Sequence, residues 1–190
     1  VEHPSIKAVG FTGSIKGGTA LCKIAANREV PIPVYAEMGS VNPVFVLPRI
    51  LESNGATLAQ NFVGSVTLGV GQFCTNPGML LLQKNEAFIS ALEQHTSTST
   101  GGVMLTTGIR DAYVKGIENT KNYTKVIGVG KAPEGFTTVE PIIFHASIEE
   151  FTQNPHLSEE IFGPTSLVVE ANTKDELMAA AQSLTGHLTA

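Results

Sequence analysis

The sequence predicts an α/β fold built around a largely parallel sheet. Short apolar runs, typical of buried strands, alternate with longer segments in which apolar residues recur at helical spacing. No internal repeat interrupts this alternation. Of the 190 residues, 42% are hydrophobic, which is enough apolar material for one globular core and part of a second.

The N-terminal part opens with a strand, a glycine turn and a helix. The apolar run 6–11 predicts a strand that breaks at Gly13, and apolar residues then recur at helical spacing up to Arg28. The runs 31–36 and 43–47 predict two further buried strands.

The rest of the chain continues the same alternation. The predicted helices lie at 50–68, 86–94, 111–118 and 174–184. The predicted strands lie at 79–83, 126–129, 138–145 and 165–169. The segment 96–102, rich in Ser, Thr and Gly, is predicted to be a loop, and Glu149 and Glu150 a short acidic turn. Strands that alternate with helices favour parallel pairing.

Charge and hydropathy argue against several classes of partner. The net charge is -5 and the 12 Lys and Arg residues are scattered, so nucleic acid and anionic membranes are poor partners. No apolar run approaches the roughly 18 residues of a membrane-spanning helix, and no basic-then-apolar signal segment is present. We therefore expect a cytoplasmic protein in which Cys22 and Cys74 are free thiols.

The two ends of the sequence are unusual for a complete protein. The chain begins at Val1 without Met and enters a predicted strand almost at once. Its last residues, HLTA, are typical of the start of another strand. The sequence therefore predicts an internal fragment of a longer polypeptide.

The first predicted turn has features of a phosphate-binding loop. Its sequence FTGSIKGG follows a strand and precedes a helix, which places Gly13 and Gly18 where the backbone turns tightly and can approach a phosphate. The spacing differs from the G-x-G-x-x-G fingerprint, so an ordinary strand-to-helix turn is the alternative.

Cys74 and Glu37 are the candidate catalytic residues. Cys74 lies in the run GQFCTNPG, a loop that suits a substrate-facing thiol better than a core residue. A thiolate nucleophile with a separate carboxylate is typical of covalent catalysis, in which the carboxylate activates water against a thioester. The alternatives are a buried structural cysteine and, for Glu37, a solvated carboxylate at a strand end.

Two further observations concern the candidate site. Phe73, next to the cysteine, is either a wall of a substrate pocket or a core residue. The five histidines are dispersed at spacings unsuited to a metal ion, so no metal site is predicted.

Four motifs follow one another along the chain, in the order FTGSIKGG, YAEMGSVNP, GQFCTNPG and EEIFGP. In this order and approximate spacing the sequence resembles the aldehyde dehydrogenase superfamily over essentially all 190 residues. The resemblance implies an aldehyde dehydrogenase-like fold. In it, 1–36 is the trailing part of a Rossmann-type NAD(P)-binding domain, and 37–190 is a catalytic α/β domain, incomplete at its C-terminal end.

The resemblance also implies a mechanism. Cys74 is expected to attack an aldehyde to give a thiohemiacetal, and hydride is expected to pass to NAD or NADP. Glu37 is then expected to activate the water that hydrolyses the thioester. The residues expected to contact the cofactor are Gly13, Ser14 and Gly18 at the pyrophosphate, Glu160 at the nicotinamide ribose and Phe162 at the nicotinamide pocket. The Cys74 amide is expected to donate a hydrogen bond to the tetrahedral oxygen.

The run SVNPVF, together with GQFCTNPG, is most similar to one branch of the family. That branch contains 2-oxoglutarate semialdehyde (2,5-dioxovalerate) dehydrogenases and NADP-linked dehydrogenases of fatty aldehydes. The expected substrate is therefore a small-molecule aldehyde, 2,5-dioxovalerate, and a broad or fatty-aldehyde dehydrogenase is the alternative. The resemblance also implies a homo-oligomer, dimeric or tetrameric, for the full-length protein.

Parts of the family's cofactor site and of its oxyanion hole have no counterpart in this sequence. The upstream strand and lysine that bind the adenosine ribose, and the asparagine that completes the oxyanion hole, are among the missing parts. We therefore expect no turnover by these 190 residues alone. A structural or binding role for a truncated chain is the non-catalytic alternative.

Overall fold

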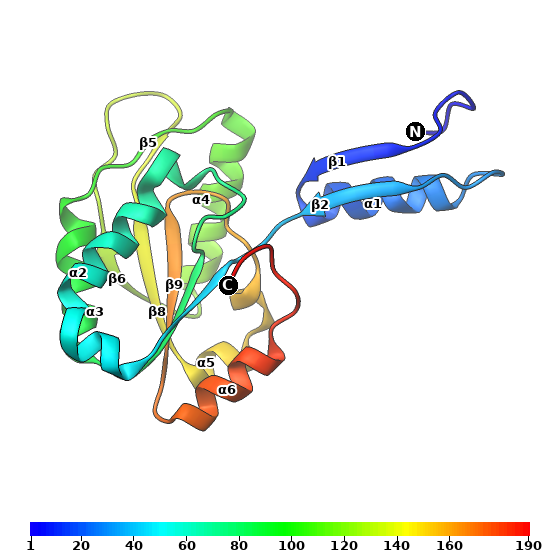
Figure 1. The fold of residues 1–190 in the computed structure, drawn as a ribbon. Coiled ribbons are helices and arrows are strands. Elements are labelled where there is room, and N and C mark those ends of the chain that lie inside the picture. The colour runs from blue at the N-terminus through cyan, green and yellow to red at the C-terminus, as the bar shows by residue number, and fades with distance from the viewer. The chain divides into compact units, whose positions relative to one another are not determined.

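The computed structural model describes residues 1–190, which form two compact units, Val1–Gly39 and Ser40–Ala190. Each unit has its own strands and helices (Figure 1). The boundary follows Gly39 rather than residue 36, because a strand continues through Met38. That the units are the end of a cofactor domain and a catalytic domain stays a prediction.

The first unit is a parallel strand pair with one helix. β1 (Val9–Gly13) pairs with β2 (Val34–Met38), and α1 (Ile15–Ala26) lies between them in the sequence. Both strands start later than predicted. The first backbone bond of the pair runs from Val9 N to the Pro33 carbonyl oxygen (3.0 Å), and Pro33 itself has no N–H for a ladder.

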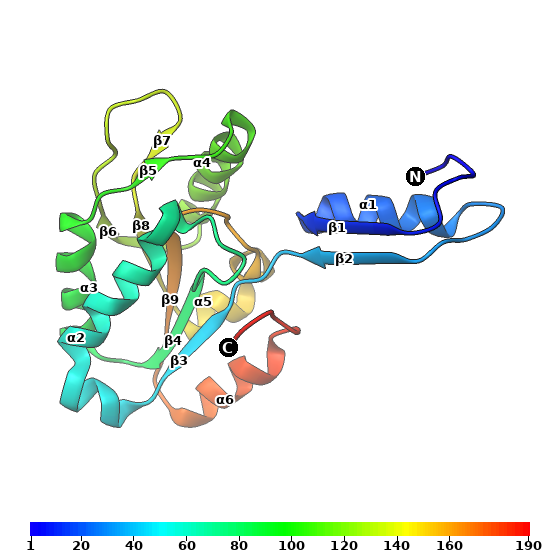
Figure 2. The same ribbon diagram turned by 45° about the horizontal axis from the view of Figure 1, so that its top comes forward.

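The second unit contains a five-stranded sheet, which Figure 2 shows from a second direction. In spatial order its strands are β3 (Pro43–Val46), β4 (Met79–Gln83), β9 (Thr165–Ala171), β8 (Ile142–Ser147) and β6 (Lys125–Val129). The first four are parallel, and β6 pairs antiparallel with β8 at one edge. Helices accompany the sheet: α2 (Pro48–Thr67), α3 (Glu86–Thr98), α4 (Thr107–Lys121), α5 (Ile148–Gln153) and α6 (Lys174–Ser183).

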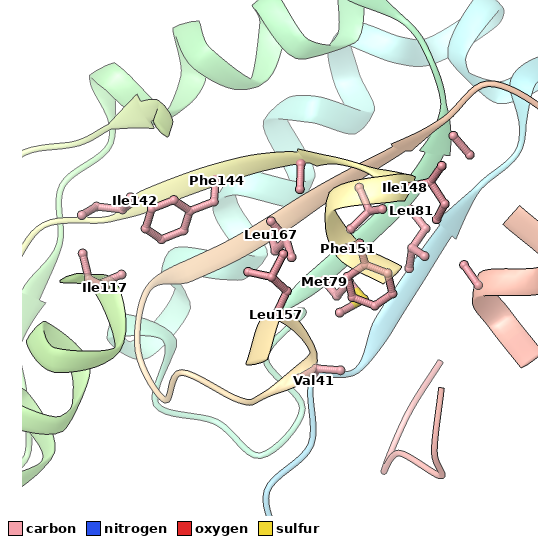
Figure 3. Close-up of a cluster of buried hydrophobic side chains, with 14 of the residues drawn as sticks. Val41, Met79, Leu81, Ile117, Ile142, Phe144, Ile148, Phe151, Leu157 and Leu167 are labelled. Carbon is pink, nitrogen blue, oxygen red and sulfur yellow. The ribbon is translucent and has the colours of Figure 1, made fainter. Parts of the chain in front are cut away.

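Two clusters of buried side chains occupy the two faces of this sheet. Leu80 and Leu82 of β4 pack with residues of α2 and α3. Met79 and Leu81 pack in the opposite cluster with residues of α4, α5 and α6, as Figure 3 shows in part. Because successive side chains of a strand point to opposite faces, β4 is buried on both, and its sequence MLLLQ suits a central parallel strand. The predicted α/β architecture is confirmed.

The segment predicted as one strand at 138–145 forms two strands. β7 (Thr138–Val139) pairs antiparallel with β5 (Gly102–Val103), a short strand that the sequence did not predict. β8 begins only at Ile142. Pro141 separates the two strands, because it has no N–H to continue a ladder.

The predicted acidic turn at Glu149 and Glu150 is wrong, since both residues lie in the first turn of α5. The Ser147 hydroxyl accepts a hydrogen bond from Glu150 N (3.2 Å), and the Glu150 carboxylate accepts one from Ser147 N (2.7 Å). This capping box starts the helix, and acidic residues there also complement the positive end of the helix dipole.

Several other boundaries differ from the prediction, and one predicted strand is absent. α3 continues through Thr98 into the segment predicted as a loop, where the Thr96 hydroxyl donates back to the Leu92 carbonyl oxygen (2.7 Å). The final segment HLTA forms no strand. Instead, Leu188 N and Thr189 N donate to the side chains of Ser40 (2.9 Å) and Asn42 (3.2 Å).

Candidate active site

Cys74 lies on an exposed turn that follows α2. A 3-10 segment, Leu68–Gly71, ends the helix, and in it Val70 has a positive φ of 60°. A β-branched residue rarely adopts this conformation, so the backbone is strained close to the thiol. The next turn is closed by a hydrogen bond from Asn76 N to the Phe73 carbonyl oxygen (3.0 Å), and Cys74 within it is exposed. The alternative of a buried structural cysteine is therefore wrong.

Two asparagine side chains hold the main chain of this turn. The Asn42 amide donates to the carbonyl oxygens of Cys74 (2.9 Å) and Asn76 (2.8 Å). The Asn76 amide in turn donates to the Gly163 carbonyl oxygen (3.2 Å). Neither role is predicted from the sequence. The available signal was that each asparagine precedes a proline, a pair typical of turns.

Gly163 is a point of close contact among three segments. Its φ is +152°, and a Cβ there would meet the Tyr113 ring. A Cβ on Gly71, before the cysteine turn, would meet the Gly163 carbonyl group. Tyr113 of α4 donates its hydroxyl to the Glu140 carbonyl oxygen (2.8 Å). Burial, and to a lesser degree the Glu140 charge, raises the pKa of Tyr113, so its hydroxyl remains a donor.

Glu160 and Phe162 lie in the segment between a 3-10 turn (Pro155–Ser158) and β9. Burial raises the pKa of the half-buried Glu160 carboxyl, and a backbone hydrogen bond with Ser40 opposes that shift. A cavity of about 30 Å³ is lined by Asn76, Glu160 and Phe162, among others. The structure therefore brings this segment beside the turn that carries the thiol.

Phe73 is 47% exposed, so the alternative of a core residue is wrong. Its ring occupies the space that a Cβ on Gly69 would need. Gly69 has a positive φ of 56°, which glycine adopts readily. Phe73 thus packs on the strained segment before the turn and remains partly exposed.

In the first unit, Glu37 lies beside the glycine turn. The parallel register pairs Thr12 with Glu37 and Gly13 with Met38. Carboxyl ends of parallel strands are the usual place for ligands in α/β sheets. Gly13 and Glu37 are both exposed there.

The glycines near the start of α1 differ in burial. The Ser14 hydroxyl caps the helix by accepting a hydrogen bond from Gly17 N (3.1 Å), and the first turn carries no acidic residue. Gly18 is buried, and a Cβ there would meet Met38. Gly18 therefore permits close packing of α1 on β2, whereas Gly13 and Ser14 lie exposed at the helix start.

No three His, Cys, Asp or Glu side chains are grouped closely enough to hold a metal ion. None of the helices combines the length and apolar character that a bilayer crossing requires.

The glycine turn, the β2 carboxylate, the cysteine turn and the Glu160–Phe162 segment belong to a sequence whose residues 1–190 match the model of the aldehyde dehydrogenase family. The chain belongs to the aldehyde dehydrogenase family. The resemblance seen in the four motifs is therefore confirmed.

Among its relatives, this aldehyde dehydrogenase chain is 43% identical over 195 residues to alpha-ketoglutaric semialdehyde dehydrogenase 2 of Azospirillum brasilense. It is 42% identical over 196 residues to alpha-ketoglutaric semialdehyde dehydrogenase of Acinetobacter baylyi. Both alignments cover 100% of this chain and 37% of the relative. The chain therefore spans little more than a third of the length of these two relatives.

Solved structures agree on the fold. Gamma-glutamyl-gamma-aminobutyraldehyde dehydrogenase from Burkholderia cenocepacia matches with a TM-score of 0.78 at 23% identity, over 96% of this chain and 38% of that one. A putative aldehyde dehydrogenase from the same species matches with a TM-score of 0.77 at 19% identity, over 95% of this chain and 40% of that one. The predicted aldehyde dehydrogenase-like fold is confirmed.

Proposed function

We propose that the protein containing this chain oxidises an aldehyde to a carboxylic acid, with Cys74 as the nucleophile. The observation that carries the proposal is the exposed Cys74 on a turn held by asparagine amides, in a chain of this family. An exposed thiol can reach a substrate carbonyl, and a fixed main chain keeps its direction of approach constant.

The first unit fits the phosphates of NAD or NADP. The N-terminus of α1, a helix of 12 residues, has no acidic side chain in its first turn, and Gly13 and Ser14 are exposed beside it. Backbone N–H groups and the helix dipole favour an anion at such a position. We assign Gly13 and Ser14 to the pyrophosphate, with Gly18 in support because it lets α1 pack closely on β2.

In the second unit, Glu160 is a half-buried carboxylate that can accept hydrogen bonds from ribose hydroxyls. Phe162, 36% exposed in the same segment, offers an aromatic face to a nicotinamide ring. The bound cofactor supplies the acceptor for the hydride.

The proposed chemistry at Cys74 is covalent. Attack of the thiolate on the carbonyl carbon forms a C–S bond and places negative charge on the oxygen, to which the Cys74 N–H is the proposed donor. Loss of hydride from this thiohemiacetal leaves a thioester. Glu37 takes a proton from water as that water attacks the thioester, and the acid and the free thiol are released.

The proposed substrate is 2,5-dioxovalerate, which is oxidised to 2-oxoglutarate. Two relatives with the name alpha-ketoglutaric semialdehyde dehydrogenase, at 43% and 42% identity, support this choice. A long-chain aldehyde is the competing substrate.

The test uses a chimera in which this chain replaces the matching segment of the Azospirillum brasilense relative. Reduction of NAD and of NADP is measured with 2,5-dioxovalerate and with a long-chain aldehyde. Cys74→Ala is expected to lower kcat at least about 1000-fold, while Cys22→Ala, the matched control, leaves it unchanged. Activity that survives in Cys74→Ala contradicts the proposed mechanism. A preference for the long-chain aldehyde contradicts the assignment of 2,5-dioxovalerate as the substrate.

The role of Glu37 is tested in the same chimera by rapid mixing. Glu37→Gln is expected to keep a burst of about one reduced cofactor per site, because the thiol step does not need the base. Steady-state turnover is expected to fall by about 100-fold or more. Loss of the burst together with turnover would place Glu37 in the first step instead.

A further inference from the structure

Asn42 occupies an unusual position immediately before β3. It is 2% exposed, and its φ of 46° lies in the left-handed region, which asparagine tolerates better than most residues. A buried amide must find partners for both its donor and its acceptor atoms. Asn42 does so entirely within the second unit.

The donor side of this amide binds the cysteine turn. Asn42 Nδ2 donates to the carbonyl oxygens of Cys74 (2.9 Å) and Asn76 (2.8 Å), on either side of Thr75. These carbonyls are 32 and 34 residues away in sequence, so no local pattern enforces the contact. Two bonds to one turn fix the orientation of its peptide planes.

The acceptor oxygen of the Asn42 amide binds Ser40 and Thr189. Asn42 Oδ1 accepts from Ser40 Oγ (2.8 Å), Thr189 Oγ1 (2.9 Å) and Thr189 N (3.2 Å). Ser40 Oγ itself accepts from Leu188 N (2.9 Å). The Leu188–Thr189 segment therefore orients the amide, and the orientation presents both donors to the turn.

We propose that Asn42 is a positioning residue for the Cys74 nucleophile. The inference rests on the proposed function, because it assigns Asn42 a role in the attack by that thiol. The two bonds hold the main chain on either side of Thr75, next to the carbon that bears the Cys74 side chain. The Cys74 carbonyl is bonded to the same Cα as the thiol-bearing Cβ, and fixing that carbonyl restricts where the sulfur points. A misplaced reacting atom can cost about 100-fold in rate.

Three variants separate positioning from folding. Asn42→Asp keeps the size and the acceptor oxygen but removes both donors. Asn42→Gly accepts the positive φ and removes the whole amide. Thr189→Val, the matched control, removes one bond on the acceptor side and leaves both bonds to the turn. Circular dichroism and urea midpoints identify which variants are folded.

The first readout is the burst rate in the chimera. Folded Asn42→Asp and Asn42→Gly are expected to lower the burst rate about 10- to 100-fold, while KM for NAD stays unchanged and Thr189→Val retains most of the rate. A folded Asn42 variant with an unchanged burst rate overturns the proposal.

The second readout needs no turnover. The alkylation rate of Cys74, divided by that of Cys22 in the same molecule, is followed across pH in this chain. For Asn42→Asp, the ratio is expected to change about fivefold or more, or its pH profile to be displaced, and a ratio equal to that of the wild type at every pH overturns the proposal. A wild-type chimera without activity would reject the proposed function and leave this readout to decide the role of Asn42.

If the Asn42 variants do not fold, hydrogen exchange in the wild-type chain still tests the proposal. The side-chain amide protons of Asn42 are expected to exchange with solvent at least about 100-fold more slowly than those of Asn61, which is exposed on α2. Equal exchange rates overturn the proposal, because the two bonds to the turn would then not persist.

Discussion

The side-chain amide of Asn76 donates a hydrogen bond of 3.2 Å to the main-chain oxygen of Gly163, 87 residues away in sequence. The bond joins the turn of Cys74 to the segment that contains Glu160 and Phe162. The proposed nucleophile and the proposed cofactor contacts of the second unit are thereby parts of one hydrogen-bonded structure.

Asn76→Asp is expected to destabilise the chain by about 2 kcal/mol at pH 7.5, because a carboxylate replaces the donor facing the Gly163 carbonyl oxygen. The carbonyl raises the pKa of the introduced carboxyl in the folded state. A raised pKa means that stability is retained at low pH and lost as pH rises, so the deficit should shrink toward pH 4. Urea denaturation at several pH values measures it. The control is Asn61→Asp, a change at an exposed position. An equal loss of stability in both variants would contradict the hydrogen bond between Asn76 and Gly163.

Gly163→Ala is expected to cost about 3 kcal/mol, since a Cβ would meet the Tyr113 ring and the residue has a φ of +152°. Gly64→Ala is the opposite case. Gly64 lies in α2 with no atom within 4 Å of an added Cβ, so the change should stabilise by about 0.5 to 1 kcal/mol. Urea midpoints of the two variants should move in opposite directions. A tolerated Gly163→Ala would mean that the Tyr113 contact is not close.

Glu160→Gln is expected to change how stability depends on pH. Burial raises the pKa of Glu160 above its ordinary value of 4.5, with the Ser40 backbone bond opposing. The wild type is therefore favoured at acid pH and loses stability as pH rises from about 4.5 through the raised pKa, whereas the glutamine does not ionise. The free energy of unfolding of the variant, relative to that of the wild type, should therefore rise between pH 4 and 7. Glu93→Gln, an exposed change on α3, is the matched control.

Two histidine–glutamate pairs provide a matched comparison. His145 Nε2 lies 2.8 Å from Glu170, with side chains 20% and 12% exposed, and Glu170 also accepts from Asn85 N (2.9 Å). His156 Nδ1 lies 2.9 Å from Glu159, with side chains 61% and 67% exposed. Glu170→Gln is expected to cost about 1 to 2 kcal/mol and Glu159→Gln less than about 0.5 kcal/mol. Equal urea midpoints for the two variants would contradict the importance of burial.

Local patterns were sufficient for much of the fold. The sequence MLLLQ specifies a strand buried on both faces, and the predicted bounds 79–83 are those of β4. Local patterns mislead at Pro141, where one missing N–H divides the segment predicted as a single strand into β7 and β8. They also mislead at Glu149 and Glu150, where adjacent acidic residues suggest a turn but Ser147 and Glu150 form a capping box that starts α5.

The alternation of strands and helices, the glycine turn, the loop of Cys74 and the family can all be predicted from the sequence. These features depend on periodicity, composition and short motifs, which lie within a few neighbouring residues. Only the folded chain shows that Asn42 holds the Cys74 turn and that Asn76 binds Gly163. These bonds join residues 32 and 87 positions apart, and their energy exists only when the chain has brought the partners together.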